Sequence, residues 1–191
     1  MRIKNWLIAA LSLVSPSLYA HTGHIDHSLI SGLLHPLTGI DHLLVLMAVG
    51  LIAAKQGGKA VLAFPAVFLA LMATGALLNA VAVQIPFVES LIALSLVAFG
   101  LLVIANDRLR GSAHPIIVFL GVSFFAVFHG YAHASEIPVG SSAVAYFSSL
   151  MLMSLVVCLI GSVIGLTTGK RISYLFSVLC LGSGLYYLAA G

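Results

Sequence analysis

Charged residues are scarce in this sequence: only 7% of its 191 residues are Asp, Glu, Lys or Arg, whereas 61% are hydrophobic. Soluble domains carry roughly 25% charged residues, so the composition predicts an integral membrane protein with no room for a sizeable soluble domain. No nucleotide-binding motif is present, which excludes ATP-driven pumping by this chain alone. Six of the eight Lys and Arg lie singly or in pairs at predicted helix ends, so a nucleic-acid partner is not expected.

Cysteine is also scarce, with two residues, Cys158 and Cys180. Both lie within apolar runs, where a free cysteine behaves as a small hydrophobic residue. The sequence therefore predicts that both thiols are buried in helix packing. A disulfide or a thiolate metal site is the less favoured alternative.

The first 20 residues resemble a cleaved secretory signal peptide. Arg2 and Lys4 form its positive end, residues 6–14 its apolar core, and residues 17–20 a plausible but imperfect cleavage site. An uncleaved additional helix stays open as the alternative. Cleavage after residue 20 would leave a short exported N-terminus that is rich in histidine. There, His21 and His24 are candidates for a weak site that collects metal ions, although a solvated polar tail would look the same.

The rest of the chain predicts six transmembrane helices, each near the roughly 20 residues that cross a bilayer. Their approximate ranges are 29–54, 60–84, 87–105, 115–134, 142–166 and 172–190. If the mature N-terminus is outside, the inner loops hold every remaining basic residue: Lys55, Lys59, Arg108, Arg110, Lys170 and Arg171. The sequence thus predicts an all-α membrane domain over residues 21–191 with both termini on the exported side.

The first predicted helix carries two histidines and an aspartate in an otherwise apolar run. His35 and His42 are seven residues apart and would share one face of a continuous helix, with Asp41 beside them. At 1.5 Å per residue, His35 would lie about 9 Å deep and the Asp41–His42 pair roughly 18 Å deep. Gly39 would let a helix or an ion approach the backbone closely, with ordinary helix packing as the alternative.

A second cluster lies at the outer end of the fourth predicted helix. His129 and His133 are four residues apart, and Glu136 is seven from His129, so all three can point at one place. The spacing resembles that of zinc proteases, but the glutamate between the histidines is missing. Glu89 begins the third helix at the same outer end, as a ligand, a proton carrier or a helix cap. Ionisable groups inside a membrane mark functional sites, so this convergence predicts a site for a metal ion or for protons.

The two histidine clusters lie in the motifs His35-Pro-Leu-Thr-Gly39-Ile-Asp41-His42 and Phe128-His129-Gly130-Tyr-Ala-His133-Ala-Ser-Glu136. These motifs resemble those of the HupE/UreJ family. Its members are small bacterial membrane proteins that are linked to nickel hydrogenases and ureases and are regarded as nickel or cobalt permeases. Ala134 departs from the glycine that the family tends to have there. The resemblance implies an inner-membrane location and these ligands: His35, Asp41, His42, His129, His133 and Glu136.

The favoured hypothesis is secondary uptake of Ni²⁺ or Co²⁺ through an intramembrane site, with Zn²⁺ as a competing ion. One alternative is a zinc-dependent intramembrane hydrolase, in which metal-bound water is the nucleophile and Asp41 or Glu136 the base. Another is an accessory protein that holds metal for the maturation of a nickel enzyme. Besides the ion and the bilayer, homo-oligomer formation through faces of small residues stays open.

Overall fold

A computed structural model describes residues 27–108 and 115–190 of the chain. The expected signal peptide over residues 1–20, and with it His21 and His24, lies outside the described part. The described residues form seven helices and no strand: α2 (His27–Thr38), α3 (Ile40–Gln56), α4 (Ala60–Ala80), α5 (Val88–Arg108), α6 (Pro115–Ser135), α7 (Ala143–Thr167) and α8 (Lys170–Ala190). The predicted all-α class is confirmed for this part of the chain.

The first expected transmembrane helix is broken, and the prediction of one continuous helix over 29–54 was wrong. Helices α2 and α3 meet at Gly39 with a bend of 75°. Pro36 lies inside α2 and has no N–H to donate, which weakens the helix just before its end. Gly39 then takes an extended conformation, with φ −84° and ψ 114°, and α3 begins with the bond from Leu43 N to Gly39 O. The depths expected for His35 and Asp41 assumed an unbroken helix and do not apply.

Five helices are long and apolar enough to cross a membrane, namely α4 to α8, and the bent pair α2–α3 would make a sixth span. The chain is therefore a membrane protein. The second expected span ends earlier than predicted, at Ala80 instead of residue 84. A loop over residues 81–87 follows it, in which Ala82 and Phe87 have positive φ angles of 58° and 59°. Backbone in that conformation cannot continue a right-handed helix.

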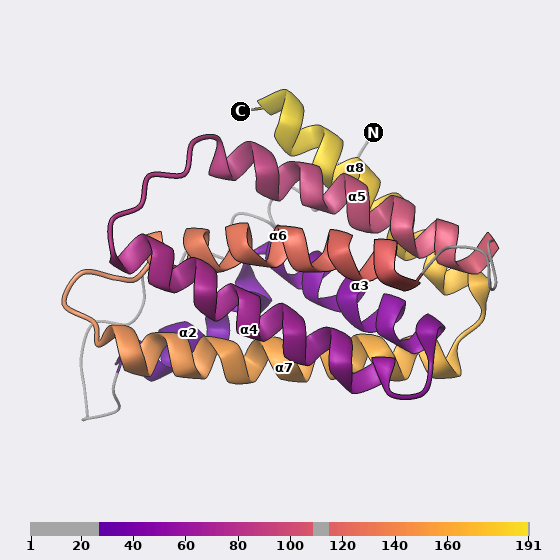
Figure 1. The fold of residues 1–191 in the computed structure, drawn as a ribbon, viewed down its shortest axis with the longest axis horizontal. Helices are drawn as coiled ribbons and strands as arrows, with labels where there is room; N and C mark the ends of the chain where they lie inside the picture. The colour runs from indigo at the N-terminus through magenta and orange to yellow at the C-terminus, as the bar shows by residue number, and fades with distance from the viewer. Residues whose placement is uncertain (1–26, 109–114, 191) are drawn as a thin grey trace, which may run out of the picture.

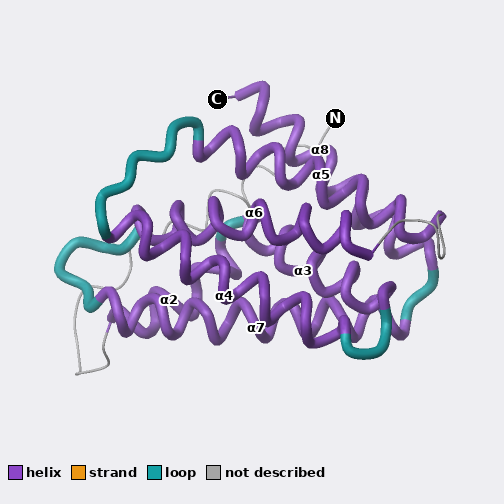
Figure 2. The backbone as a smooth tube through the Cα atoms, in the orientation of Figure 1, coloured by secondary structure: helices purple, strands orange, loops and turns teal. Residues whose placement is uncertain are grey.

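The helices run side by side along the length of the molecule (Figure 1). They form three closely packed pairs, α3 with α7, α4 with α6 and α5 with α8, and the short α2 lies against α7. Helix α3 is the central element, since 11 of its 17 residues are buried and it contacts every other helix pair. Figure 2 shows the α3–α4, α4–α5, α6–α7 and α7–α8 loops at the two ends of this bundle.

The two ends of the bundle differ in charge. The α3–α4 and α7–α8 turns lie at one end, and the α4–α5 and α6–α7 loops lie at the other (Figure 1). The first end carries the basic residues near those turns: Lys55, Lys59, Lys170 and Arg171. The second end carries Glu89 and Glu136. This separation has the pattern that the positive-inside rule describes, with acidic groups gathered at the opposite end.

Each close helix pair contains a glycine at which the two backbones meet. A Cβ on Gly75 would collide with the backbone of Val127 on α6, and one on Gly50 would collide with Cys158 O on α7. At Gly184 of α8 it would lie 2.8 Å from Ala93 O of α5. Close approach at small residues is how membrane helices gain van der Waals contact. Both cysteines are free and buried in this packing, as expected.

We expect Gly75→Ala to destabilise the protein, because the new methyl group would force α4 away from α6. Overpacking of this kind lowers the free energy of unfolding by about 1–3 kcal/mol. The matched control is Gly182→Ala on α8, where an added Cβ meets nothing within 4 Å. Thermal unfolding in detergent measures both variants. Equal unfolding temperatures for the two variants would contradict the close packing of α4 on α6.

Candidate metal centre

Four side chains from separate segments meet at the acidic end of the bundle. His35 comes from α2, His42 from α3 and His133 from α6, and Glu136 follows the last residue of α6. Each offers one ligand atom, and these four atoms all lie within 4.8 Å of one another. Ligands about 2.1 Å from a tetrahedral metal ion lie roughly 3.4 Å apart, so only a small contraction would close the group around an ion.

Glu136 lies at the centre of this group. Its Oε2 is 3.0 Å from His35 Nε2, 3.7 Å from His133 Nδ1 and 3.9 Å from His42 Nε2. The imidazole rings also touch one another: the ring centroids of His42 and His133 are 4.0 Å apart, and those of His35 and His133 are 4.9 Å apart. One carboxylate oxygen therefore faces all three rings.

The break at Gly39 brings the first two histidines together. Instead of lying along one helix face, His35 and His42 face each other across the bend, with ring centroids 5.2 Å apart. A Cβ on Gly39 would lie 2.7 Å from Cδ2 of His42, so only glycine leaves room for that ring. Gly130 has a different role, because a Cβ there would collide with the backbone of Met72 on α4. The first glycine therefore shapes the cluster, and the second serves helix packing.

Three ring nitrogens of the cluster are buried. Nδ1 of His42 has no hydrogen-bond partner, whereas Nε2 of His35 and Nδ1 of His133 have the carboxylate of Glu136 as a neighbour, at 3.0 and 3.7 Å. Buried polar atoms are nearly always hydrogen-bonded, and an unpaired one costs about 1–3 kcal/mol. Imidazole nitrogen and carboxylate oxygen suit Ni²⁺, Co²⁺ and Zn²⁺ as ligands. The donor set therefore fits a divalent transition-metal ion.

The carboxylate keeps its charge in this environment. Burial raises the pKa of the Glu136 carboxyl, but the imidazoles of His133, His35 and His42 outweigh burial, so its pKa lies below its ordinary value. The Glu136 side chain is 44% exposed, whereas that of His133 is 2% exposed. An anionic oxygen thus lies at the surface with buried imidazole nitrogens behind it, which is the order in which an arriving cation would meet them.

Two further carboxylates lie near the cluster but outside the group of four. Asp41 Oδ2 is 3.8 Å from His42 Nε2, and the Asp41 side chain is 24% exposed. Glu89, on the first turn of α5, is exposed and lies within electrostatic range of Glu136 and Asp41. Three acidic side chains, from α3, from α5 and from just past the end of α6, therefore gather at this end of the bundle. They create a negative potential that attracts cations.

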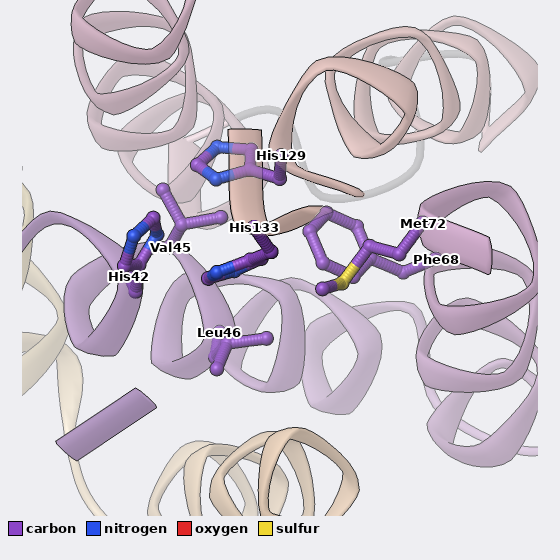
Figure 3. A pocket seen from close by; sticks show the side chains of 7 residues that line it. All are labelled: His42, Val45, Leu46, Phe68, Met72, His129 and His133. Atoms are coloured by element: carbon purple, nitrogen blue, oxygen red, sulfur yellow. The ribbon is translucent and has the colours of Figure 1, made fainter. Parts of the chain in front are cut away.

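His129 lies one helical turn from His133, about 6 Å further into the bundle. It is 2% exposed, and its ring centroid is 5.8 Å from that of His42. It is outside the group of four, and its Nε2 lies 2.9 Å from Ser95 Oγ. A small pocket connects it with the cluster (Figure 3), and its lining residues are His42, Val45, Leu46, Phe68, Met72, His129 and His133. This pocket is too narrow to hold a water molecule.

Two residues near the site were not identified from the sequence. Ser95 is fully buried on α5 and meets His129. Tyr146 on α7 is 1% exposed, its ring centroid is 5.9 Å from that of His35, and its hydroxyl has no hydrogen-bond partner. Neither residue stands out in the sequence, because single serines and tyrosines recur throughout the apolar helices. Their polarity within an apolar run is a signal that many packing residues share.

The comparisons with known proteins agree on one family. A family model described as HupE / UreJ protein matches residues 9–190. Protein HupE of Rhizobium leguminosarum bv. viciae is 37% identical to this chain over 155 residues, which are 81% of this chain and 78% of that protein. No solved structure matches the chain. The resemblance based on the two histidine motifs is thereby confirmed.

We expect Tyr146→Phe to stabilise the metal-free protein, because it removes a buried hydroxyl that has no partner. The desolvation penalty of such a group is about 1–3 kcal/mol. The matched control is Tyr131→Phe, which deletes a hydroxyl that donates to Val83 O at 2.9 Å and should lower stability. Unfolding temperatures in detergent measure both. A loss of stability in Tyr146→Phe as large as that in Tyr131→Phe would show that the Tyr146 hydroxyl is hydrogen-bonded.

Proposed function

The chain belongs to the HupE/UreJ family, and we propose that it is a secondary transporter that carries Ni²⁺ or Co²⁺ inward across a membrane. The observation that carries this proposal is the group of four donors at one end of a membrane bundle, in which three imidazole rings face one carboxylate oxygen. His35, His42, His133 and Glu136 would hold the ion by replacing part of its water shell. Each ring must be neutral to bind, so binding displaces any proton on the ligating nitrogen.

The remaining candidate residues would act before and after this group. His21 and His24 would collect ions on the exported side, and the charges of Asp41 and Glu89 would raise the local cation concentration near the group of four. His129 would receive the ion further inside. This order uses every histidine and every acidic residue of the two motifs and runs from the exposed, acidic end to the buried histidine.

The distribution of charge supports inward transport across a bacterial inner membrane with both termini in the periplasm. Under the positive-inside rule, the end that carries Lys59 and Lys170 faces the cytoplasm and the acidic end faces outward. Two positive charges that move inward gain about 4.6 kcal/mol per 100 mV of inside-negative potential. That drive suffices without nucleotide hydrolysis.

The bundle below the cluster supports a carrier over an open channel. The pocket at His129 is too narrow for water, and α3 is apolar and buried from Leu44 to Ala54, apart from the half-buried Met47. An ion held at the cluster therefore has no water-sized path through that pocket. Transport requires a second arrangement of the helices, as in other carriers whose binding site opens alternately to the two sides.

The decisive experiment follows metal entry into sealed liposomes that contain the purified protein under an inside-negative potential. We expect uptake of Ni²⁺ or Co²⁺ in preference to Zn²⁺ and Fe²⁺. His42→Ala and His133→Ala should each lower the rate about tenfold or more, because both remove a donor from the group of four. His27→Ala is the matched control: its histidine is exposed on the first residue of α2, outside that group.

The other hypotheses have their own outcomes in the same preparation. Stoichiometric metal binding without flux would contradict transport and favour the accessory protein. Zinc-dependent hydrolysis of a lipid amide, lost in His133→Ala, would favour the intramembrane hydrolase. Preferential flux of Zn²⁺ over Ni²⁺ and Co²⁺ would contradict the proposed substrate.

Two glutamates allow direct contact with the metal ion to be distinguished from electrostatic attraction of the ion at a distance. Glu136→Gln should weaken metal binding about tenfold or more at every salt concentration, because Glu136 would touch the ion. Glu89→Gln should lower the rate of uptake at low salt and have little effect at 0.5 M salt, where exposed charges are screened within about 5 Å. Uptake rates at several ionic strengths measure this difference. A salt-independent effect of Glu89→Gln would make Glu89 a ligand instead.

A further inference from the structure

The hydroxyl hydrogen of Ser95 has two neighbours that compete for it. Ser95 is fully buried on α5. Its Oγ lies 2.6 Å from the carbonyl oxygen of Ile92 and 2.9 Å from Nε2 of His129. A serine hydroxyl has one hydrogen to donate and two lone pairs to accept with. The two contacts therefore cannot both be donated by Ser95.

The shorter contact decides where that hydrogen lies. The carbonyl oxygen of Ile92 can only accept, and two oxygens 2.6 Å apart repel each other unless a hydrogen lies between them. Ser95 must therefore donate to Ile92. Its contact with His129 then requires a hydrogen on the histidine, so Nε2–H of His129 donates to Ser95 Oγ.

This bond fixes the tautomer of the ring. In a neutral imidazole one nitrogen carries the hydrogen and the other keeps its lone pair. With the hydrogen held on Nε2, the lone pair of His129 is on Nδ1. The ring lines the pocket that also touches His42 and His133 (Figure 3). Metal-binding histidines commonly use one nitrogen as ligand and donate the other N–H to a neighbour that orients the ring.

We propose that Ser95 is a positioning residue, which holds His129 in the Nε2–H tautomer so that Nδ1 is a ready ligand for an ion leaving the outer cluster. The role in transport rests on the function proposed above, whereas the tautomer does not. The three histidines of the group of four are different: their neighbour is the carboxylate of Glu136, which is itself a candidate ligand of the ion. His129 is thus oriented before the ion arrives, whereas those three rings and Glu136 rearrange around it.

The tautomer is tested first, in metal-free protein with ¹⁵N-labelled histidine rings. Protonated and unprotonated ring nitrogens have well-separated chemical shifts, and the His129 signals are assigned by their absence in His129→Gln. We expect a protonated Nε2 and an unprotonated Nδ1 in the natural protein, and a mixture of tautomers in Ser95→Ala. Ser95→Thr keeps a hydroxyl and should restore the single tautomer. A protonated Nδ1 in the natural protein, or an unchanged tautomer in Ser95→Ala, would overturn the proposal.

Transport kinetics test the role of the tautomer. Ser95→Ala should lower the maximal rate of uptake about 10–100-fold, the usual effect of losing such an orienting partner, with KM changed less than about twofold. KM reports the outer cluster, which Ser95 does not touch. Ser95→Thr should recover most of the rate. The matched control, Ser177→Ala, removes a buried serine that bonds only to the backbone of Ser173, and uptake should not change.

The two measurements separate this inference from the proposed function. Normal uptake in Ser95→Ala, or equal losses in Ser95→Ala and Ser177→Ala, would overturn the positioning role. If the natural protein shows the expected tautomer but no metal flux, the proposed function fails and the role of Ser95 in transport fails with it. The hydrogen bond from His129 to Ser95 would stand in that case.

Discussion

One ionised carboxylate with three imidazole rings around it, at the end of an apolar bundle, is the interaction on which the rest of the structure depends. Glu136 lies within 4 Å of a nitrogen on each of three histidines. Burial of polar groups in an apolar bundle is unfavourable unless they have partners, so the surrounding helices must hold the carboxylate and the rings together. The backbones meet closely at Gly50 and Gly75, which packs α3 against α7 and α4 against α6. The packing of the bundle therefore supports the arrangement of side chains at its acidic end.

The candidate ligands are visible in the sequence, but their arrangement is not. Imidazole and carboxylate side chains are conspicuous in apolar runs, and both motifs contain residues that the structure brings together. The expected geometry of His35 and His42 was nonetheless wrong, since both were placed on one face of a continuous helix. Pro36 and Gly39 carried the signal for the break. Both residues also occur inside unbroken membrane helices, so their presence alone does not set a bend of 75°.

The buried part of the site, around Ser95 and His129, could not be predicted for a different reason. Helices of soluble proteins reveal their buried face by apolar residues that recur every three to four positions. These helices are apolar all round, so the sequence does not show which serine faces the pocket. Ser95 looks like any packing serine, and only its distances to Ile92 and His129 distinguish it. The same limit applies to His129 and His133. Spacing placed both on one face, yet His133 joins the group of four and His129 lies one turn deeper with its own partner.

The group of four and His129 differ in a way that bears on a general problem of carriers. A site must bind an ion firmly enough to capture it and weakly enough to release it. In the proposed mechanism the outer group includes the anionic Glu136, so it offsets part of the charge of a divalent ion. His129 has no carboxylate among the residues that line its pocket with it. An ion that moves inward thus exchanges an anionic ligand for a neutral one, which weakens its binding. A lone pair already fixed in direction limits that loss, since no ring has to reorient when the ion arrives. The membrane potential can then supply the remaining free energy for two charges to leave the carboxylate behind.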